Sequence, residues 1–161
     1  MIEVRVRRIE GVISTDDIMP ARYKHSFTDP SDMAPHVFEH RVPDLAASLH
    51  LGDALVGDSV FGIGSSREQA VSALHAAGVR AVLAPAFGRI FFRNCWNLGL
   101  PAIELDASQF LERSLIGIDL EAGLVICGDN RLGFPRPPQF MLDMAAAGGL
   151  LSVIKKREVL G

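Results

Sequence analysis

Residues 70–105 read AVSALHAAGVRAVLAPAFGRIFFRNCWNLGLPAIEL and form the most regular part of the chain. Apolar residues recur in them at helical spacing twice, over 70–77 and over 87–98. A glycine follows each apolar face, Gly78 the first and Gly99 the second, at the point where helices commonly stop. The pattern predicts two helices of similar length.

The segments around these helices are typical of strands. Short apolar runs occupy 80–84 and 101–105, and a third run occupies 54–61. Strands that alternate with helices in this order pair in parallel, through right-handed crossovers. Residues 4–12 predict one or two further strands, and residues 116–127 predict a hairpin.

Segments rich in polar residues and proline complete the chain. Residues 14–17 are turn formers and predict a loop, whereas 29–39 predict a helix with Pro30 in its first turn. A last helix is expected over 140–145. No repeat, low-complexity tract or linker interrupts the sequence, so we predict a single α/β domain over residues 1–161.

Size and charge exclude several functional classes. At 161 residues and 48% apolar, the chain can bury one core. Its uncharged runs fall short of the ~20 residues that a membrane span needs, and residues 1–8 alternate apolar and charged side chains, unlike a signal peptide. The net charge of −3 argues against nucleic-acid binding, and Lys155-Lys156-Arg157 is interpreted as a solvated tail. We therefore expect a cytoplasmic protein that binds neither nucleic acid nor membrane.

The cysteines and histidines predict no metal site. Cys95 and Cys127 stand far apart without CxxC spacing, whereas an iron–sulfur cluster needs more thiolates than these. Free cysteines commonly behave as small apolar residues, and we expect both to be inert. His36 and His40 are one helical turn apart, a spacing that can bind zinc, but no third ligand accompanies them.

The segment 62–68, GIGSSRE, lies between a predicted strand and a predicted helix. Its two glycines allow a tight turn, and N–H groups at the start of a helix can face an incoming anion. Arg67 adds a planar guanidinium that suits a carboxylate. The same residues also fit a capping box, with Ser65 at the N-cap and Glu68 at the third helical position. The residues alone leave capping and anion binding open, but no lysine follows as in a P-loop.

Residues 57–70, which contain GSSRE, resemble the signature of the swivelling domain of the aconitase superfamily. The resemblance continues in order through 77–101, and upstream 15–23 are similar to the family's TDxIxP loop. Residues 147–150, AGGL, resemble the closing motif of its separate small subunits. The chain is thereby similar to the small subunits of isopropylmalate dehydratases. This resemblance implies a three-layer β/β/α swivelling domain, like the aconitase C-terminal domain, with a mostly parallel central sheet.

The resemblance implies a hydro-lyase subunit that is active only with a partner. In that family a [4Fe–4S] cluster is held by a separate large subunit, and no cofactor is expected on this chain. The reaction is dehydration and rehydration of a small hydroxy-acid, here 2-isopropylmalate to 3-isopropylmalate in leucine biosynthesis, by a heterodimer or heterotetramer. The alternatives are a small subunit acting on homoaconitate or on citramalate and methylmalate, a non-catalytic anion-binding module, and a structural lid.

The resemblance also implies roles for individual residues. Ser65 is expected to be the base that removes the proton α to a carboxylate, with Asp16 as a second catalytic residue on the facing loop. Four residues are expected to bind the substrate, namely Gly64, Ser66, Arg67 and Arg22. A serine hydroxyl is a poor base, so its anion needs a helix N-terminus, a guanidinium and a site closed to water.

The loop Tyr23-Lys24-His25-Ser26 is expected to select the substrate side chain. Relatives that act on isopropylmalate tend to be apolar there, and homoaconitases carry a basic residue that meets an extra carboxylate. Lys24 and His25 therefore favour a more polar substrate, unless both side chains point to solvent. Ile63 and Gln69 stand where many relatives have Cys and His, and neither is expected to be catalytic.

Overall fold

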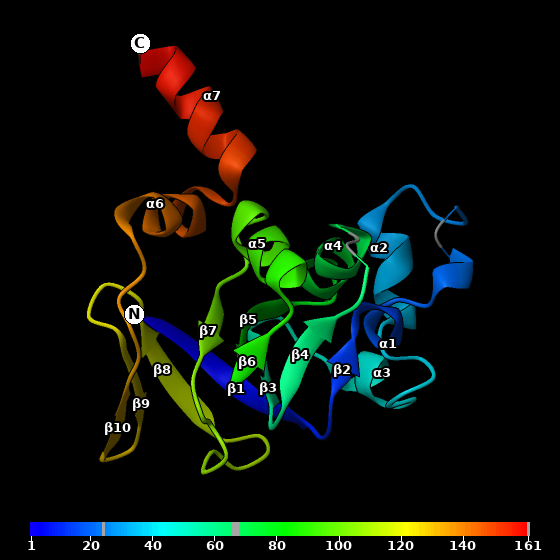
Figure 1. The fold of residues 1–161 in the computed structure, drawn as a ribbon, viewed down its shortest axis with the longest axis horizontal. Coiled ribbons are helices and arrows are strands. Elements are labelled where there is room, and N and C mark those ends of the chain that lie inside the picture. The colour runs from blue at the N-terminus through cyan, green and yellow to red at the C-terminus, as the bar shows by residue number, and fades with distance from the viewer. Residues whose placement is uncertain (24, 66–67, 161) are drawn as a thin grey trace.

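Two β-sheets organise the structure (Figure 1). The computed structural model describes residues 1–23, 25–65 and 68–160. The larger sheet has seven strands in the order β10-β9-β8-β1-β3-β5-β7, and the smaller sheet has three in the order β2-β4-β6. The strands are β1 (Ile2–Ile9), β2 (Ile13–Ser14), β3 (Asp53–Gly57), β4 (Val60–Ile63), β5 (Val79–Ala84), β6 (Ala86–Phe87), β7 (Ala102–Glu104), β8 (Leu115–Asp119), β9 (Leu124–Cys127) and β10 (Asn130–Gly133).

The helices gather mainly around the smaller sheet. Helices α4 and α5 lie side by side next to β4, and α7 extends beyond α6, away from both sheets (Figure 1). The α-helices are α1 (Thr15–Ile18), α2 (Pro30–Met33), α3 (Leu45–Ser48), α4 (Glu68–Ala76), α5 (Arg89–Asn97), α6 (Gln139–Ala147) and α7 (Leu150–Leu160). Two 3-10 helices are η1 (Ala21–Tyr23) and η2 (Ala34–His36). The two helices predicted within 70–105 correspond to α4 and α5, and both are confirmed.

Strand β1 divides the larger sheet into two halves. On one side it pairs in parallel with β3, and β5 and β7 continue the parallel order. On the other side it pairs antiparallel with β8, followed by β9 and β10. The parallel half, together with the parallel smaller sheet, confirms the pairing predicted from the order of strands and helices. The larger sheet as a whole is mixed.

The central strand β3 of the larger sheet is buried on both faces, and the protein has a core on each side of it. Leu55 of β3 packs with Phe61 of β4 and Leu74 of α4 in the core that the smaller sheet and the helices cover. Its neighbours Ala54 and Val56 are buried in the core on the opposite face. Burial on both faces explains why β3 is apolar without alternation. The larger sheet, the smaller sheet and the helices form the predicted β/β/α layers.

The single strand predicted over 54–61 is wrong. Strands β3 and β4 both lie in this region, but they belong to different sheets. Asp58, in the turn between them, accepts a hydrogen bond from the backbone N–H of Gly11 at 2.8 Å. Gly11 lies in the turn from β1 to β2, so the chain passes between the sheets twice at the same place. Both strands are short apolar runs, and periodicity therefore does not reveal the break.

The helix predicted from Asp29 to Glu39 begins as expected and ends early. The Asp29 side chain caps α2, but the α-helix stops at Met33. Pro35 causes this end, because it has no N–H to donate and disfavours the helical conformation in the residue before it. The tighter helix η2 follows instead.

The loop predicted at 14–17 is a helical turn, α1. Ser14 Oγ accepts from the Asp17 N–H at 3.0 Å, and the Asp17 carboxylate accepts from the Ser14 N–H at 2.8 Å. This reciprocal pair is a capping box, and it stabilises a helix start. The composition of residues 14–17 did not reveal this helical turn, because the same residue types favour both loops and helix caps.

Strand β10 and helix α7 have no counterpart among the predicted elements. The predicted tail residues Lys155-Lys156-Arg157 lie in α7, and their side chains are exposed. Val153 packs against the core, so the first turns of α7 are attached to the domain. No helix within the described ranges is long and apolar enough to cross a membrane.

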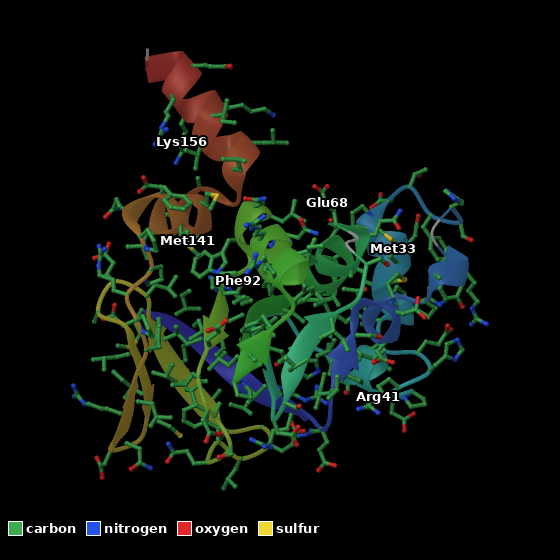
Figure 2. All side chains as sticks on the ribbon, viewed as in Figure 1. Met33, Arg41, Glu68, Phe92, Met141 and Lys156 are labelled. Atoms are coloured by element: carbon green, nitrogen blue, oxygen red, sulfur yellow. The ribbon has the colours of Figure 1, made fainter. Side chains whose placement is uncertain are left out.

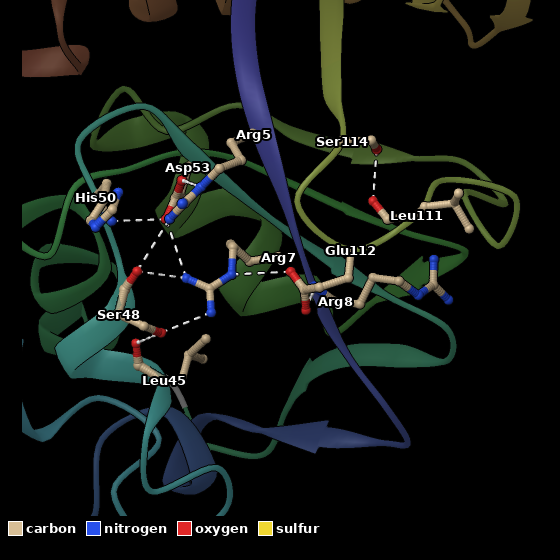
Figure 3. A network of polar contacts seen from close by, with 10 residues as sticks. All are labelled: Arg5, Arg7, Arg8, Leu45, Ser48, His50, Asp53, Leu111, Glu112 and Ser114. Carbon is tan, nitrogen blue, oxygen red and sulfur yellow. Dashed lines mark hydrogen bonds and ion pairs between the residues drawn. The ribbon is translucent and has the colours of Figure 1, made fainter.

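A buried carboxylate joins β1 to β3 and to the end of α3 (Figure 3). Asp53 is 1% exposed and accepts from Nε and Nη2 of Arg5, both at 2.8 Å. Nη1 of Arg7 lies 3.5 Å from the same carboxylate and 2.8 Å from the carbonyl oxygen of Ser48. The backbone N–H of His50 also donates to Asp53, at 2.8 Å. Each oxygen of the buried carboxylate therefore has a donor.

The surroundings of Asp53 favour its charged form. Burial acts to raise the pKa of this carboxyl, but the hydrogen bonds from Arg5 and from the His50 N–H, with the charges of Arg5 and Arg7, outweigh it and lower the pKa. A buried charge is tolerated only where it is paired and hydrogen-bonded. The pairing of β1 with β3 at this point therefore requires the positive charges of Arg5 and Arg7.

The variant Asp53→Asn should lower the free energy of unfolding by about 3 kcal/mol, because it removes the charged carboxylate that Arg5 and Arg7 share and leaves Arg7 with Glu112 as its carboxylate partner. Urea denaturation at neutral pH measures the loss. Because the folded-state pKa lies below the usual 3.8, the wild-type advantage is present above that pH and disappears as the pH falls through the folded-state pKa. The matched control is Asp129→Asn, in the exposed turn before β10. An equal loss in both variants would contradict the assignment.

Candidate functional site

The loop after β4 lies beside the loop after β2. These strands pair in parallel, with Ser14 opposite Ile63, so the residues that follow both strands emerge at the same edge of the smaller sheet. Gly64 and Ser65 follow β4 there, and Asp16 of α1 follows β2. The fold thus brings together the two loops on which the predicted catalytic residues lie.

One hydrogen bond connects the two loops directly. Thr15 Oγ1 donates to the carbonyl oxygen of Ser65 at 2.8 Å, and Thr15 is only 4% exposed. Gly64 packs at the same place, since a Cβ atom on it would lie 3.4 Å from Thr15 Oγ1. Asp16 is exposed and accepts from the N–H of Ala21 at 2.9 Å, which holds the turn that leads to η1.

The path of the loop depends on close packing at Gly62. This residue has a φ of 87°, and a Cβ atom on it would overlap the side chain of Phe91 in α5. A Cβ atom on Gly88 would overlap the carbonyl oxygen of Gly62, and the Gly88 N–H donates to the Phe61 carbonyl at 2.9 Å. Only glycine fits at both positions, so this contact sets where the chain leaves β4 toward Ser65.

The predicted base and its neighbours lie on the surface. Gly64 and Ser65 are exposed, as is Glu68, which points outward from the start of α4 (Figure 2). Ser66 and Arg67 lie outside the described residues. The capping box of Ser65 with Glu68 and the carboxylate-binding roles of Ser66 and Arg67 therefore stay predictions.

The predicted specificity loop is tied to a carboxylate that the sequence motifs do not single out, Glu39. Nη2 of Arg22 donates to Glu39 Oε2 at 2.8 Å and to the Tyr23 hydroxyl at 2.7 Å. The Tyr23 hydroxyl itself donates to Glu39 Oε2 at 2.7 Å. Nδ1 of His36 lies 3.1 Å from Glu39 Oε1. Both carboxylate oxygens are thus engaged.

These donors keep Glu39 ionised. The hydrogen bond from Tyr23 and then that from His36 lower the pKa of the Glu39 carboxyl to about 2, with a further contribution from Arg22. In turn, the hydrogen bonds of Arg22 to Tyr23 and Glu39 raise the pKa of its guanidinium. Arg22, predicted to bind substrate, is therefore already the partner of a charged carboxylate in this chain.

The rest of the specificity loop is open to solvent in the isolated chain. His25 and Ser26 are exposed, and Tyr23 is half-buried. Lys24 lies outside the described residues. The proposed contact of Lys24 and His25 with a substrate therefore remains a prediction.

Sequence reasoning missed Glu39 because its partners lie far away in the chain. Tyr23 and Arg22 precede it by 16 and 17 positions. The available signal was the spacing of three residues between His36 and Glu39, which puts two residues on one side of a helical turn. That spacing is common, and it does not point to the loop.

The described residues include two cysteines and two clefts, but no cluster of metal ligands. In the part of the chain that the structure describes, no three His, Cys, Asp or Glu side chains are grouped as they would be around a metal ion. Cys95 is buried, which raises the pKa of its thiol, and Cys127 is half-buried. Two clefts, of about 790 Å³ and about 290 Å³, border α6, beside Leu142 and Met141 respectively, and do not include Ser65.

Comparison with known proteins places the chain in a family. Residues 33–108 match the model of the aconitase C-terminal domain. The 3-isopropylmalate dehydratase small subunit of Nautilia profundicola is 43% identical over 159 residues, which cover 97% of this chain and 95% of that protein. The chain belongs to the family of 3-isopropylmalate dehydratase small subunits. Another member, from Saccharolobus islandicus strain Y.N.15.51, is 41% identical over 162 residues, covering 99% of this chain and 98% of its own length.

A solved structure extends the agreement to three dimensions. The crystal structure of a 3-isopropylmalate dehydratase from Methanocaldococcus jannaschii matches with a TM-score of 0.91 and 32% identity, and covers 99% of this chain and 96% of that one. The α/β fold predicted from the resemblance is thereby confirmed. So is the family itself, a group of lyase small subunits within the aconitase superfamily.

The variant Thr15→Val should loosen the loop that carries Ser65 in this dehydratase small subunit. Valine keeps the shape of threonine but removes the donor to the Ser65 carbonyl, which should cost about 1 kcal/mol of unfolding free energy. Amide hydrogen exchange over residues 62–65 should also become faster. The same change at the exposed Thr28 is the control and should have neither effect. Equal exchange rates in the two variants would show that this bond does not hold the loops together.

Proposed function

We propose that this chain is the small subunit of a heteromeric hydro-lyase that converts 2-isopropylmalate into 3-isopropylmalate by dehydration and rehydration. The observation that carries the proposal is the full-length similarity to relatives of that name, at 43% and 41% identity. The exposed position of Ser65, whose carbonyl oxygen accepts from Thr15, the residue before Asp16, supports it. Proposed site residues that lie on an open surface are consistent with an active site that a second chain completes.

Ser65 is the proposed base that takes the proton α to a substrate carboxylate. A serine hydroxyl holds its proton tightly at neutral pH, so its anion needs strong stabilisation. The N-terminus of α4, a helix of nine residues, contributes its positive dipole end, and Arg67 contributes a positive charge. Because Ser65 is exposed in the isolated chain, the large subunit has to cover it and exclude water.

Further residues are proposed to bind the substrate carboxylates. Ser66 and Arg67, with the backbone of Gly64, take one carboxylate, because a guanidinium and adjacent N–H groups match its two oxygens. Arg22 uses Nη2 for Glu39 and Tyr23, and the other nitrogens of its five-donor fork are proposed to face a second carboxylate. Asp16, on the facing loop, is proposed to take part in proton transfer.

The iron–sulfur cluster is proposed to belong to the large subunit. The chain contains two cysteines, and Cys95 is buried, so these residues do not fit the three or four thiolates of such a cluster. When bound in the complete site, the cluster supplies a Lewis acid for the substrate hydroxyl. This chain then contributes the base, the carboxylate contacts and the lid that closes the site.

A second candidate is a related hydro-lyase with a more polar substrate, such as homoaconitate or citramalate and methylmalate. The observation that favours it is the sequence Lys24-His25 in the specificity loop, with His25 exposed. Burying an unpaired ammonium against an isopropyl group costs several kcal/mol, which amounts to orders of magnitude in selectivity. A non-catalytic anion-binding module is the remaining alternative.

Reconstitution with the large subunit of the same organism tests the proposal. The pair, with its cluster restored under anaerobic conditions, is assayed against 2-isopropylmalate, homoaconitate, citramalate and methylmalate. Turnover of 2-isopropylmalate with the highest kcat/KM supports the first candidate, and a preference for another acid supports the second. A well-assembled pair that converts none of them, or a small chain active alone, contradicts the proposal.

The variant Ser65→Ala should abolish turnover while assembly with the large subunit stays intact. The reason is that alanine removes the proposed base, and if Ser65 also caps α4 the variant loses about 1 kcal/mol of stability. Size-exclusion chromatography checks assembly, and the kcat of the reconstituted pair measures turnover. Ser152→Ala, on α7, is the control and should keep wild-type activity. Substantial activity in a folded Ser65→Ala heteromer rules out the base assignment.

A further inference from the structure

We propose that Glu39 is a positioning residue that holds the Tyr23–Ser26 loop in the orientation from which it selects the substrate side chain. The selecting role of the loop rests on the proposed function, whereas the positioning of the loop by Glu39 rests on contacts within this chain. Glu39 itself touches no substrate in this proposal. It acts through Arg22 and Tyr23.

The contacts of Glu39 divide between two segments. Its Oε2 accepts from Arg22, the residue before the loop, at 2.8 Å and from the hydroxyl of Tyr23, the first residue of the loop, at 2.7 Å. Its Oε1 lies 3.1 Å from Nδ1 of His36, in η2. One carboxylate therefore clamps the loop to η2. Charge-assisted hydrogen bonds of this kind are shorter and stronger than neutral ones.

Aromatic packing completes the clamp. The rings of His36, Tyr23 and Phe27 contact one another in a triangle, and the His36 centroid lies 4.7 Å from that of Tyr23 and 5.2 Å from that of Phe27. The Tyr23 and Phe27 centroids are 5.5 Å apart, and the guanidinium carbon of Arg22 lies 4.7 Å from the Tyr23 centroid. These contacts hold Tyr23, the first residue of the loop, and Phe27, the residue that follows it.

Glu39 is itself anchored to the core. Its neighbour Phe38 is completely buried, and the Phe38 N–H donates to the Ile18 carbonyl of α1 at 2.9 Å. Phe38 has a φ of 56°, which bulky residues rarely adopt and which turns the chain here. Its ring packs edge-on against Phe61 of β4, with centroids 6.3 Å apart. Because β4 leads directly to Ser65, Glu39 links the position of the loop to that of the proposed base.

A purely stabilising role is the competing explanation, and it predicts different behaviour. A stabilising residue affects how much protein is folded, and it leaves the KM and the substrate ranking of the folded fraction unchanged. A positioning residue changes KM and ranking, because the substrate meets a displaced loop, while the chemistry at Ser65 and therefore kcat change little.

The first measurement is made on the chain alone. Tyr23 is the only tyrosine in the sequence, so labelling with 3-fluorotyrosine places a single ¹⁹F resonance in the loop. In Glu39→Ala this resonance should move toward that of free fluorotyrosine and become narrower. Glu39→Gln should be intermediate, because its amide oxygen can still accept from Tyr23 while its amide nitrogen cannot accept from His36. Glu121→Gln, in the exposed turn before β9, is the matched control and should leave the resonance unchanged.

The second measurement is made on the reconstituted pair. Glu39→Ala should raise the KM for the best substrate roughly tenfold or more, the scale of one lost charge-assisted hydrogen bond. Its kcat should stay within about twofold of wild type, because no group that reacts with the substrate is altered. The ratio of kcat/KM between 2-isopropylmalate and homoaconitate should also change, and Glu39→Gln should recover part of both effects.

Each outcome bears on one claim. An unchanged ¹⁹F resonance in Glu39→Ala overturns the positioning of the loop by Glu39. A shifted resonance with unchanged KM and substrate ranking, in an active pair, overturns the link from the loop to the substrate. A wild-type pair that converts none of the acids defeats the proposed function, and the resonance still decides whether Glu39 holds the loop. A shifted resonance together with changed KM and ranking supports the whole inference.

Discussion

The structure depends first on a single buried negative charge. Asp53 is removed from water at the start of β3, and this is tolerated only because Arg5 and Arg7 of β1 reach the same carboxylate. Strand β1 is where the parallel and antiparallel halves of the larger sheet meet. The ion pair therefore secures the strand pairing from which β3 and β4 continue toward the loop of Ser65. A charged core costs desolvation, but it specifies one register of β1 on β3, with Arg5 opposite Asp53.

Local patterns predicted the parts of the fold whose reasons are local. Helices α4 and α5 have an apolar face and a stop signal within their own residues, so periodicity sufficed. The division of 54–61 between two sheets has a distant cause, the turn at Gly11 that packs against Asp58. A buried strand also looks the same in either sheet, because both of its faces are apolar. Helix α7 was not predicted from the sequence, because its apolar residues do not form one continuous face that a core would bury.

The candidate site also contains residues that local patterns predicted and residues that they did not. The Gly64-Ser65 loop and the Asp16 loop could be found because their residues form contiguous motifs, and the parallel pairing of β2 with β4 brings them together. Glu39 could not be found, because its role comes from a tertiary contact with Arg22 and Tyr23. The motif predicted Arg22 as a ligand for the substrate without revealing that a carboxylate already holds it. Sequence motifs identify the residues around a reaction more readily than the residues that orient them.

The contact between Gly62 and Gly88 affects how this family can accept mutations. Gly88 is the N-cap of α5, and α5 carries Phe91, the residue that a side chain at position 62 would strike. A methyl group at either position must therefore displace the same helix. Once α5 has moved, the second methyl group meets less resistance, so the two penalties are less than additive. Substitutions at the two glycines are therefore expected to be epistatic. A relative that loses either glycine is expected to have α5 in a shifted position.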